Sequence, residues 1–300
     1  MQNSRTQAGF LSLPNDSMFK TLAVALTLCL FCSIIVSTAA TLLKPMQVVN
    51  KLLDKKKNIL AVSGIELNGK SVDELFTQIE TRVVDMQSGD YTDAVDPNTF
   101  DQRKASKDSA YRVELDRDQD IAKLGGGRSK FASVYLVNNG DQLERIILPI
   151  KGYGLWSTMY GFLALEKDAT TVSGITFYEH GETPGLGGEI ENPKWQASWQ
   201  GKKIFNQGGQ PALRVIKGAV NLNSADAVYQ IDGLAGASLT SNGVSNLIMF
   251  WVGEDGFGPY LEKLRLQSSQ LQQANSNRDD SFKKISSSVI LRTNNQTGQG

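Results

Sequence analysis

The chain has only two cysteines and one histidine among its 300 residues. Both cysteines, Cys29 and Cys32, lie in an N-terminal apolar run, so the rest of the chain offers neither a disulfide framework nor a thiolate metal site. Their i, i+3 spacing favours two small packing residues of a helix over a redox pair. Lys and Arg together number 31, as do Asp and Glu, so no excess of positive charge indicates a nucleic-acid partner.

The single histidine also limits the chemistry that the chain can perform. His180 is flanked by Glu179 and Glu182, which supply no separate activated nucleophile, and this argues against a hydrolase. A metal site built from these residues and Glu189 is conceivable, but the His-x-x-x-His type of spacing is missing, and we expect no metal. Neither a P-loop nor a dinucleotide-binding glycine pattern follows a predicted strand, so we expect no NADH site.

One long uncharged stretch lies near the N-terminus, between Lys20 and Lys44. A helix over residues 21–43 would reach about 34 Å at 1.5 Å per residue, enough for a hydrocarbon core of about 30 Å. We therefore expect a single uncleaved membrane span over residues 18–43. The alternative is a cleaved signal peptide, for which residues 37–40 offer small side chains to a peptidase.

Beyond this span, the hydrophobic pattern predicts helices combined with an antiparallel sheet. A capping box at residues 71–74 predicts a helix whose apolar stripe continues to Ile79 and Val83. Period-two alternation on both sides of Asn139-Gly140 predicts a hairpin. A second pair of strands is expected over residues 161–165 and 172–179.

The C-terminal half adds three further predicted elements. Asn192 and a following proline predict the start of a short helix that carries Trp195 and Trp199. This aromatic pair could face a ligand, but packing against the sheet is the favoured interpretation. A strand is expected over residues 213–220 and a closing amphipathic helix over 258–266. The last residues are rich in Ser, Gln and Asn, which predicts disorder. The expected fold class is α+β, divided into an N-terminal segment, a transmembrane helix, a soluble domain and a disordered tail over residues 1–17, 18–43, 44–266 and 267–300.

The stretch from Asp232 to Gly243 combines small residues with three hydroxyls just before an apolar run. A helix beginning near Ser241 would direct free N–H groups and the positive end of its dipole at a ligand on these hydroxyls, which suits a phosphate. On spacing alone, a glycine-rich turn followed by a helix N-cap is the favoured interpretation. The hydroxyl residues are Ser238, Thr240 and Ser241.

The run Gly236-Ala237-Ser238-Leu239-Thr240 resembles the [Ser/Thr]-Gly-Ala-[Ser/Thr]-x-Thr flavinylation motif of FMN-binding subunits of membrane redox pumps. In that family the last threonine carries FMN through a phosphodiester bond, which implies Thr240 here. Ala235 replaces the usual Ser or Thr at the first position. The resemblance covers roughly residues 16–265 and is strongest to the C subunits of Na⁺-translocating NADH:quinone oxidoreductases, to which residues 97–105 are also similar.

This resemblance implies an electron-relay flavoprotein within a six-subunit complex of the bacterial inner membrane, with its soluble domain in the periplasm. It also implies that a separate flavin transferase attaches the FMN, so that the site needs an exposed threonine hydroxyl and no base of its own, and we expect no catalytic residue in this chain. The lysines that follow the span, from Lys44 to Lys57, indicate the opposite orientation by the positive-inside rule. Two alternatives are the flavin subunit of the related ferredoxin:NAD⁺ oxidoreductase complex and a cofactor-free, membrane-anchored binding module.

An isoalloxazine ring needs apolar walls and hydrogen-bond donors near its pyrimidine edge. Leu155, Trp156 and Leu186 are candidate walls, Thr183 and the amides of residues 185–188 are candidate donors, and Lys217 could stabilise an anionic ring. The candidate FMN-binding residues are Thr240 as the covalent site, with Gly236, Ala237, Ser238, Leu239, Ser241, Leu155, Trp156, Thr183, Leu186, Gly187 and Lys217.

Overall fold

The computed structural model describes residues 17–66, 68–140 and 142–270, which fall into two compact units that divide after Asp54. The first unit is part of helix α1, Met18–Ser63. An 18-residue window of α1 has a mean hydropathy of 2.4, and the helix is long and apolar enough to cross a membrane. α1 continues through Pro45 to Ser63, so the basic stretch that follows the apolar run is also helical.

Five antiparallel strands form the central sheet of the second unit, in the order β1-β4-β5-β6-β7. The predicted hairpin is confirmed, because β4 and β5 pair directly and Gly140 in their turn has a φ of 60°. The second predicted pair is confirmed as β6 and β7. The strand bounds are Ile79–Asp85 (β1), Phe131–Asn139 (β4), Gln142–Tyr153 (β5), Thr158–Glu166 (β6) and Val172–Glu179 (β7).

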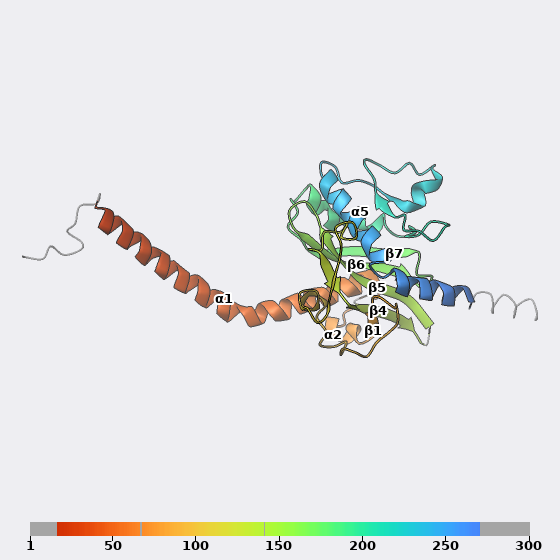
Figure 1. Cartoon of the computed structure of the whole chain (residues 1–300), viewed down its shortest axis with the longest axis horizontal. Helices are drawn as coiled ribbons and strands as arrows, with labels where there is room; N and C mark the ends of the chain where they lie inside the picture. The colour runs from red at the N-terminus through yellow and green to blue at the C-terminus, as the bar shows by residue number, and fades with distance from the viewer. Residues whose placement is uncertain (1–16, 67, 141, 271–300) are drawn as a thin grey trace, which may run out of the picture. The chain divides into compact units, whose positions relative to one another are not determined.

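Side chains of the sheet alternate between two apolar clusters, one on each face. On β5, Ile147 packs in the smaller cluster with Ile59 and Leu60 from the end of α1. Its neighbours Ile146 and Leu148 pack in the larger cluster, which includes the apolar side of helix α5, Ser238–Val252. Figure 1 shows α5 and the short helix α2, Val72–Phe76, on opposite sides of the sheet. The sheet is therefore a middle layer, as the α+β prediction requires.

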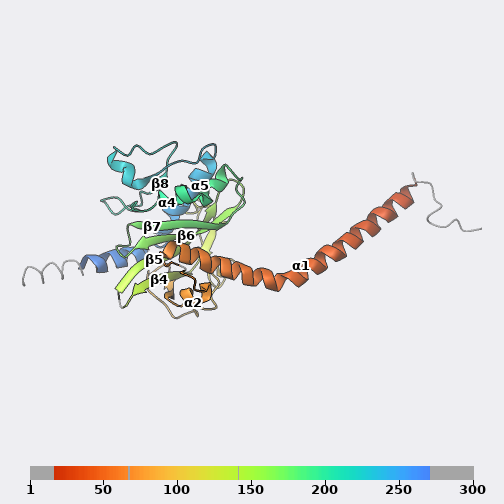
Figure 2. The same cartoon turned by 180° about the vertical axis from the view of Figure 1, so that it is seen from behind.

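The remaining elements are short and connect or cover the sheet. α4 lies on the same side of the sheet as α5 (Figure 2). The bounds of these elements are Gln102–Ala105 (α3), Arg112–Glu114 (β2), Gly127–Ser129 (β3), Gly187–Glu191 (η2), Pro193–Ala197 (α4), Arg214–Val215 (β8), Ala225–Tyr229 (η3), Gln230–Ile231 (β9) and a last helix over residues 258–270.

The capping box is confirmed, but the helix that it begins is shorter than predicted. The Ser71 side chain accepts a hydrogen bond from the Glu74 amide at 3.3 Å. α2 nevertheless ends at Phe76, and Ile79 and Val83 lie on β1. These branched side chains suit a half-buried strand, and pairing of β1 with β4 stabilises the extended backbone. Tertiary pairing has therefore overridden a helical spacing.

Two other predictions about element bounds are corrected by the structure. The strand expected over residues 213–220 is limited to Arg214–Val215, which pairs in parallel with β9, and Lys217 lies in the exposed loop that follows. α5 begins at Ser238, not near Ser241, so the hydroxyls lie inside its first turns. The closing helix is present but continues to residue 270, so the prediction of a disordered tail is wrong for residues 267–270, and the rest of that prediction, residues 271–300, lies outside the described residues.

The helix predicted after Asn192 is confirmed, and its tryptophans are packing residues. The Asn192 side chain accepts a hydrogen bond from the Lys194 amide at 3.0 Å, as an N-cap does. Trp195 and Trp199 are both buried, with ring centroids 5.4 Å apart in an edge-to-face arrangement. They belong to the larger apolar cluster, so neither offers a free face to a ligand.

Candidate functional site

Two glycines bring the start of α5 close to the end of β5. A Cβ on Gly152 would lie 2.8 Å from the Cβ of Leu247, and one on Gly243 would lie 2.7 Å from the carbonyl oxygen of Tyr153. Any larger residue at either position would push the helix away from the strand. The close approach places Thr240, in the first turn of α5, beside the turn that joins β5 to β6.

A buried carboxylate connects Thr240 to this turn. The Thr240 hydroxyl donates a hydrogen bond to Oε2 of Glu182 at 2.6 Å. Oε1 of Glu182 accepts from the amides of Leu155 and Trp156, each at 3.0 Å, and from that of Ser157 at 3.4 Å. Burial alone would raise the pKa of the Glu182 carboxyl, but these hydrogen bonds outweigh it and hold the pKa below its ordinary value. Glu182 is therefore ionised at neutral pH.

Glycines on two further segments leave room around this carboxylate. A Cβ on Gly187 would lie 2.5 Å from Oγ1 of Thr240 and 2.9 Å from Oε2 of Glu182. A Cβ on Gly154 would lie 2.4 Å from Oε1 of Glu182. Both positions therefore require glycine for the Thr240–Glu182 pair to form as it does.

Large apolar side chains are exposed on the segments that meet at Thr240. Leu155 and Trp156 belong to the β5–β6 turn, Leu186 immediately precedes Gly187, and Leu239 immediately precedes Thr240. Trp156 is 65% exposed and Leu239 is 60% exposed, whereas most apolar residues of β5 and β6 are buried. Exposed leucines and a tryptophan on adjoining turns are typical of a surface that receives a planar apolar ligand.

These features fit FMN, with one correction to the sequence-based expectation. The start of a 15-residue helix offers free amides to a phosphate, and the exposed apolar side chains suit a flavin ring. Thr240, however, is only 1% exposed, whereas we expected an exposed hydroxyl. Attachment of a phosphate to Thr240 therefore requires the turn that contains Gly187 to move aside.

The other predicted residues of the motif occupy different environments. Ser238 lies exposed in the first turn of α5, whereas Ala237 is buried at the N-cap position. Ser241 is buried, and its hydroxyl accepts a hydrogen bond from the Leu234 amide at 3.1 Å. Gly236 has a φ of 69°, which favours glycine, and a Cβ there would lie 3.0 Å from Leu186. The structure thus brings the motif and the Leu186 turn together.

Two predicted contacts are less closely connected to Thr240. The carbonyl oxygen of Thr183 accepts hydrogen bonds from the amides of Leu186 and Gly188, so these two amides already have an acceptor. The Thr183 residue itself is exposed. Lys217 is exposed on a loop whose Gly218 carbonyl accepts from the Gly233 amide, and within the described residues no hydrogen bond joins Lys217 to Thr240.

Sequence reasoning missed Glu182 as part of this site and considered it only as a weak metal ligand. Within the described residues no group of three or more His, Cys, Asp and Glu residues is arranged to hold a metal ion. His180 instead bonds through Nε2 to Glu191 at 2.8 Å, and its Nδ1 accepts from the Glu182 amide at 3.1 Å. The only sequence signal for Glu182 was an acidic residue at the start of a glycine-rich turn.

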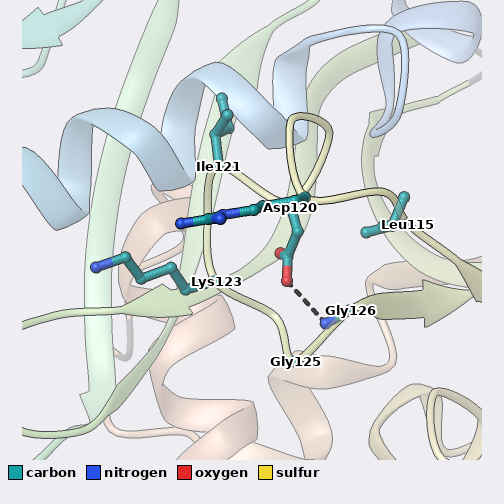
Figure 3. A pocket seen from close by; sticks show the side chains of 7 residues that line it. Leu115, Asp120, Ile121, Lys123, Gly125 and Gly126 are labelled. Carbon is teal, nitrogen blue, oxygen red and sulfur yellow. Dashed lines mark hydrogen bonds between the residues drawn. The ribbon is translucent and has the colours of Figure 1, made fainter.

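A separate hollow of about 650 Å³ lies in the loop between β2 and β3. Figure 3 shows Asp120 among the lining residues, with its Oδ2 accepting a hydrogen bond from the Gly126 amide at 2.8 Å. Oδ1 accepts from the Leu124 amide at 2.6 Å, so this carboxylate serves to hold the loop. The hollow is open and shares no lining residue with the surroundings of Thr240, and we assign it no cofactor.

The side-chain amine of Lys151, on β5, has a lowered pKa, and this gives a test of the folded structure. Burial and the nearby cations Arg103, Lys107 and Arg112 lower the pKa of Lys151 to about 8. Between about pH 8 and 10.5, the folded chain has lost this proton while the unfolded chain retains it. The free energy of unfolding should therefore rise with pH across this window, by about 3 kcal/mol at most.

Urea unfolding of the chain in detergent at pH 7.5 and pH 10 measures this rise. Lys151→Met should flatten the rise, whereas Lys167→Met, a change of an exposed lysine, should leave it as in the wild type. Equal pH dependence in the wild type and in Lys151→Met would show that the Lys151 amine is not perturbed in the folded chain.

The segment that contains this site matches a known domain family. Residues 154–253 match the FMN-binding domain family. The chain is 51% identical over 254 residues to the C subunit of the Na(+)-translocating NADH-quinone reductase of Pseudomonas aeruginosa, with 83% of this chain and 97% of that relative covered. It is 53% identical over 252 residues to the protein of the same name from Vibrio vulnificus, with 84% and 97% covered.

Solved structures show the same fold. The crystal structure of Shewanella oneidensis NqrC superimposes with a TM-score of 0.65 at 30% identity and covers 70% of this chain and 96% of that one. The crystal structure of the corresponding reductase component from Parabacteroides distasonis gives a TM-score of 0.57 at 25% identity and covers 73% and 96%. These matches confirm the α+β prediction of an antiparallel sheet with packed helices.

Proposed function

This chain belongs to the family of C subunits of Na⁺-translocating NADH-quinone reductases, and from that premise we propose that it carries FMN bound covalently through phosphate to Thr240. The observation that carries the proposal is the position of Thr240. Its hydroxyl lies in the first turn of α5, at the end of the resembled motif, and close to the exposed apolar side chains of Leu155, Trp156 and Leu186. When bound, FMN supplies one- and two-electron transfer, which suits an electron-relay subunit of an oxidoreductase complex.

The residues of the chain bind and orient the cofactor. The first amides of α5 and its positive dipole end stabilise the phosphate charge. Leu155, Trp156, Leu186 and Leu239 form apolar walls for the ring and exclude water from it. Thr183 contributes its exposed side chain as a donor, and Lys217 contributes charge only if its loop moves toward the ring.

The membrane helix determines the cellular location of the proposed electron relay. We propose that α1 anchors the chain in the bacterial inner membrane with the second unit in the periplasm, beside the other subunits of a six-subunit complex. A separate flavin transferase completes maturation. The lysines after the span oppose this orientation by the positive-inside rule. A membrane-impermeant, cysteine-directed label tests the orientation. The label is applied to the variant Ser238→Cys, in which Cys29 and Cys32 are replaced by serine, and labelling from the periplasmic side supports the proposal.

Production of the full chain with and without a flavin transferase of this family tests the proposed attachment. We expect a fluorescent band after denaturing electrophoresis only with the transferase, and a mass increase of one FMN on the peptide that contains residues 235–242. A chain that is folded but shows neither fluorescence nor added mass would rule out covalent FMN. A cofactor-free binding module would give that result.

A further inference from the structure

The Thr240 hydroxyl donates to the Oε2 atom of Glu182, at 2.6 Å. Glu182 and Thr240 are 5% and 1% exposed. The nearby acidic groups have other partners, because Glu189 accepts from the Asn192 side chain and Glu191 bonds to His180. Among the described residues, no other carboxylate or imidazole forms a hydrogen bond with this hydroxyl. Its proton therefore has one evident acceptor.

The two oxygens of the Glu182 carboxylate have different hydrogen-bond partners. Oε1 is held by the amides of Leu155, Trp156 and Ser157, which belong to the β5–β6 turn. Oε2 faces Thr240 and accepts only one further contact, from the Leu155 amide at 3.2 Å. Because the anchor lies on the β5–β6 turn, the Glu182 carboxylate can keep its place when the turn that contains Gly187 moves away from Thr240.

We propose that Glu182 is the catalytic residue of this chain that accepts the Thr240 proton when FMN is attached, an inference that rests on the proposed function. A phosphate monoester such as free FMN has no good leaving group, so the donor must be a flavin phosphoanhydride, of which flavin adenine dinucleotide is the common form. Oγ1 of Thr240 bonds to the phosphorus of the FMN part, the phosphoanhydride bond breaks, and adenosine monophosphate leaves with the bond electrons. The proton passes from Oγ1 to Oε2 of Glu182 and then to solvent, and no atom is oxidised or reduced.

Loss of the Thr240 hydroxyl proton also changes the contact between Thr240 and Glu182. After the phosphodiester forms, Thr240 can no longer donate to Glu182, and the phosphate brings a negative charge beside the carboxylate. Like charges at this separation repel, so the 2.6 Å contact is a feature of the cofactor-free chain. The ionised state of Glu182 agrees with a role as acceptor, because a carboxylate that is already deprotonated can take the proton.

Glu182→Gln separates proton transfer from anchoring. The glutamine oxygen can replace Oε1 against the three amides, which places an NH₂ group, a donor, toward Thr240. The full chain in detergent, mixed with flavin adenine dinucleotide and an excess of transferase, is sampled over time by intact mass. We expect the initial rate of FMN incorporation to fall about 100-fold or more, as for removal of a general base. The matched variant Glu189→Gln should stay within about twofold of the wild-type rate.

The results of this experiment distinguish a failure of the proposed function from a failure of the proposed role of Glu182. If the wild type gains no FMN mass, the proposed function fails. If the wild type gains it and Glu182→Gln gains it at a similar rate, only the role of Glu182 fails. Near-ultraviolet circular dichroism measures the folded fraction to which each rate is normalised. If Glu182→Gln is largely unfolded, Glu182→Asp decides: no incorporation by a folded chain that retains a carboxylate would overturn proton acceptance, and a measurable rate would support it.

Discussion

Thr240→Val is expected to abolish covalent FMN completely, because valine lacks the oxygen that would form the phosphodiester. The added methyl group has nearly the shape of the hydroxyl, but it leaves Oε2 of Glu182 without its strongest donor. Loss of a hydrogen bond to a buried charged group costs about 1–3 kcal/mol, so the variant should fold with a lowered melting temperature. Intact mass after production with a transferase measures attachment, and thermal unfolding measures stability.

The neighbouring hydroxyls provide matched controls for this variant. Ser238→Ala removes an exposed hydroxyl from the same helical turn and should retain the full FMN mass. Ser241→Ala removes the acceptor of the Leu234 amide and should lose some stability but keep the attachment. FMN mass on the Thr240→Val peptide would move the attachment site to one of these serines.

The sequence predicted Thr240 as the attachment residue, which stays a prediction, but it did not predict the surroundings of Thr240. The motif that ends at Thr240 is local, so a resemblance could identify it. The burial of Thr240 depends on Gly187, which belongs to a turn far earlier in the chain. No local pattern reports such a contact, and for this reason the hydroxyl was expected to be exposed.

Glu182 illustrates a second limit of sequence reasoning. Side-chain patterns can indicate pairs of charged groups, but most partners of this carboxylate are backbone amides in the β5–β6 turn. Every residue except proline carries such an amide, so the amino-acid sequence does not indicate which amides act as donors to a side chain. Ile79 shows the same limit for the fold, because its spacing fits a helical stripe and a strand equally, and pairing of β1 with β4 decides between them.

Gly187→Ala is expected to impair both stability and FMN attachment. The new Cβ would lie 2.5 Å from Oγ1 of Thr240 and 2.9 Å from Oε2 of Glu182, so at least one of these groups must move. Overpacking of this kind costs about 1–3 kcal/mol. A displacement of about 1 Å at a reacting oxygen can reduce a rate on the order of 100-fold. Thermal unfolding and the initial rate of FMN incorporation measure the two effects.

Gly174→Ala is the matched control, because its Cβ would make ordinary contacts at 3.7 Å with Val62. This variant should keep the wild-type rate of FMN incorporation. The comparison also tests whether the turn at Gly187 covers Thr240 when the cofactor is attached. If Gly187→Ala is destabilised yet incorporates FMN at the wild-type rate, the turn has already left Thr240 before the phosphodiester forms. If both stability and rate fall, the displaced Thr240 oxygen or Glu182 carboxylate limits the reaction, so the geometry of this pair matters for attachment as well as for stability.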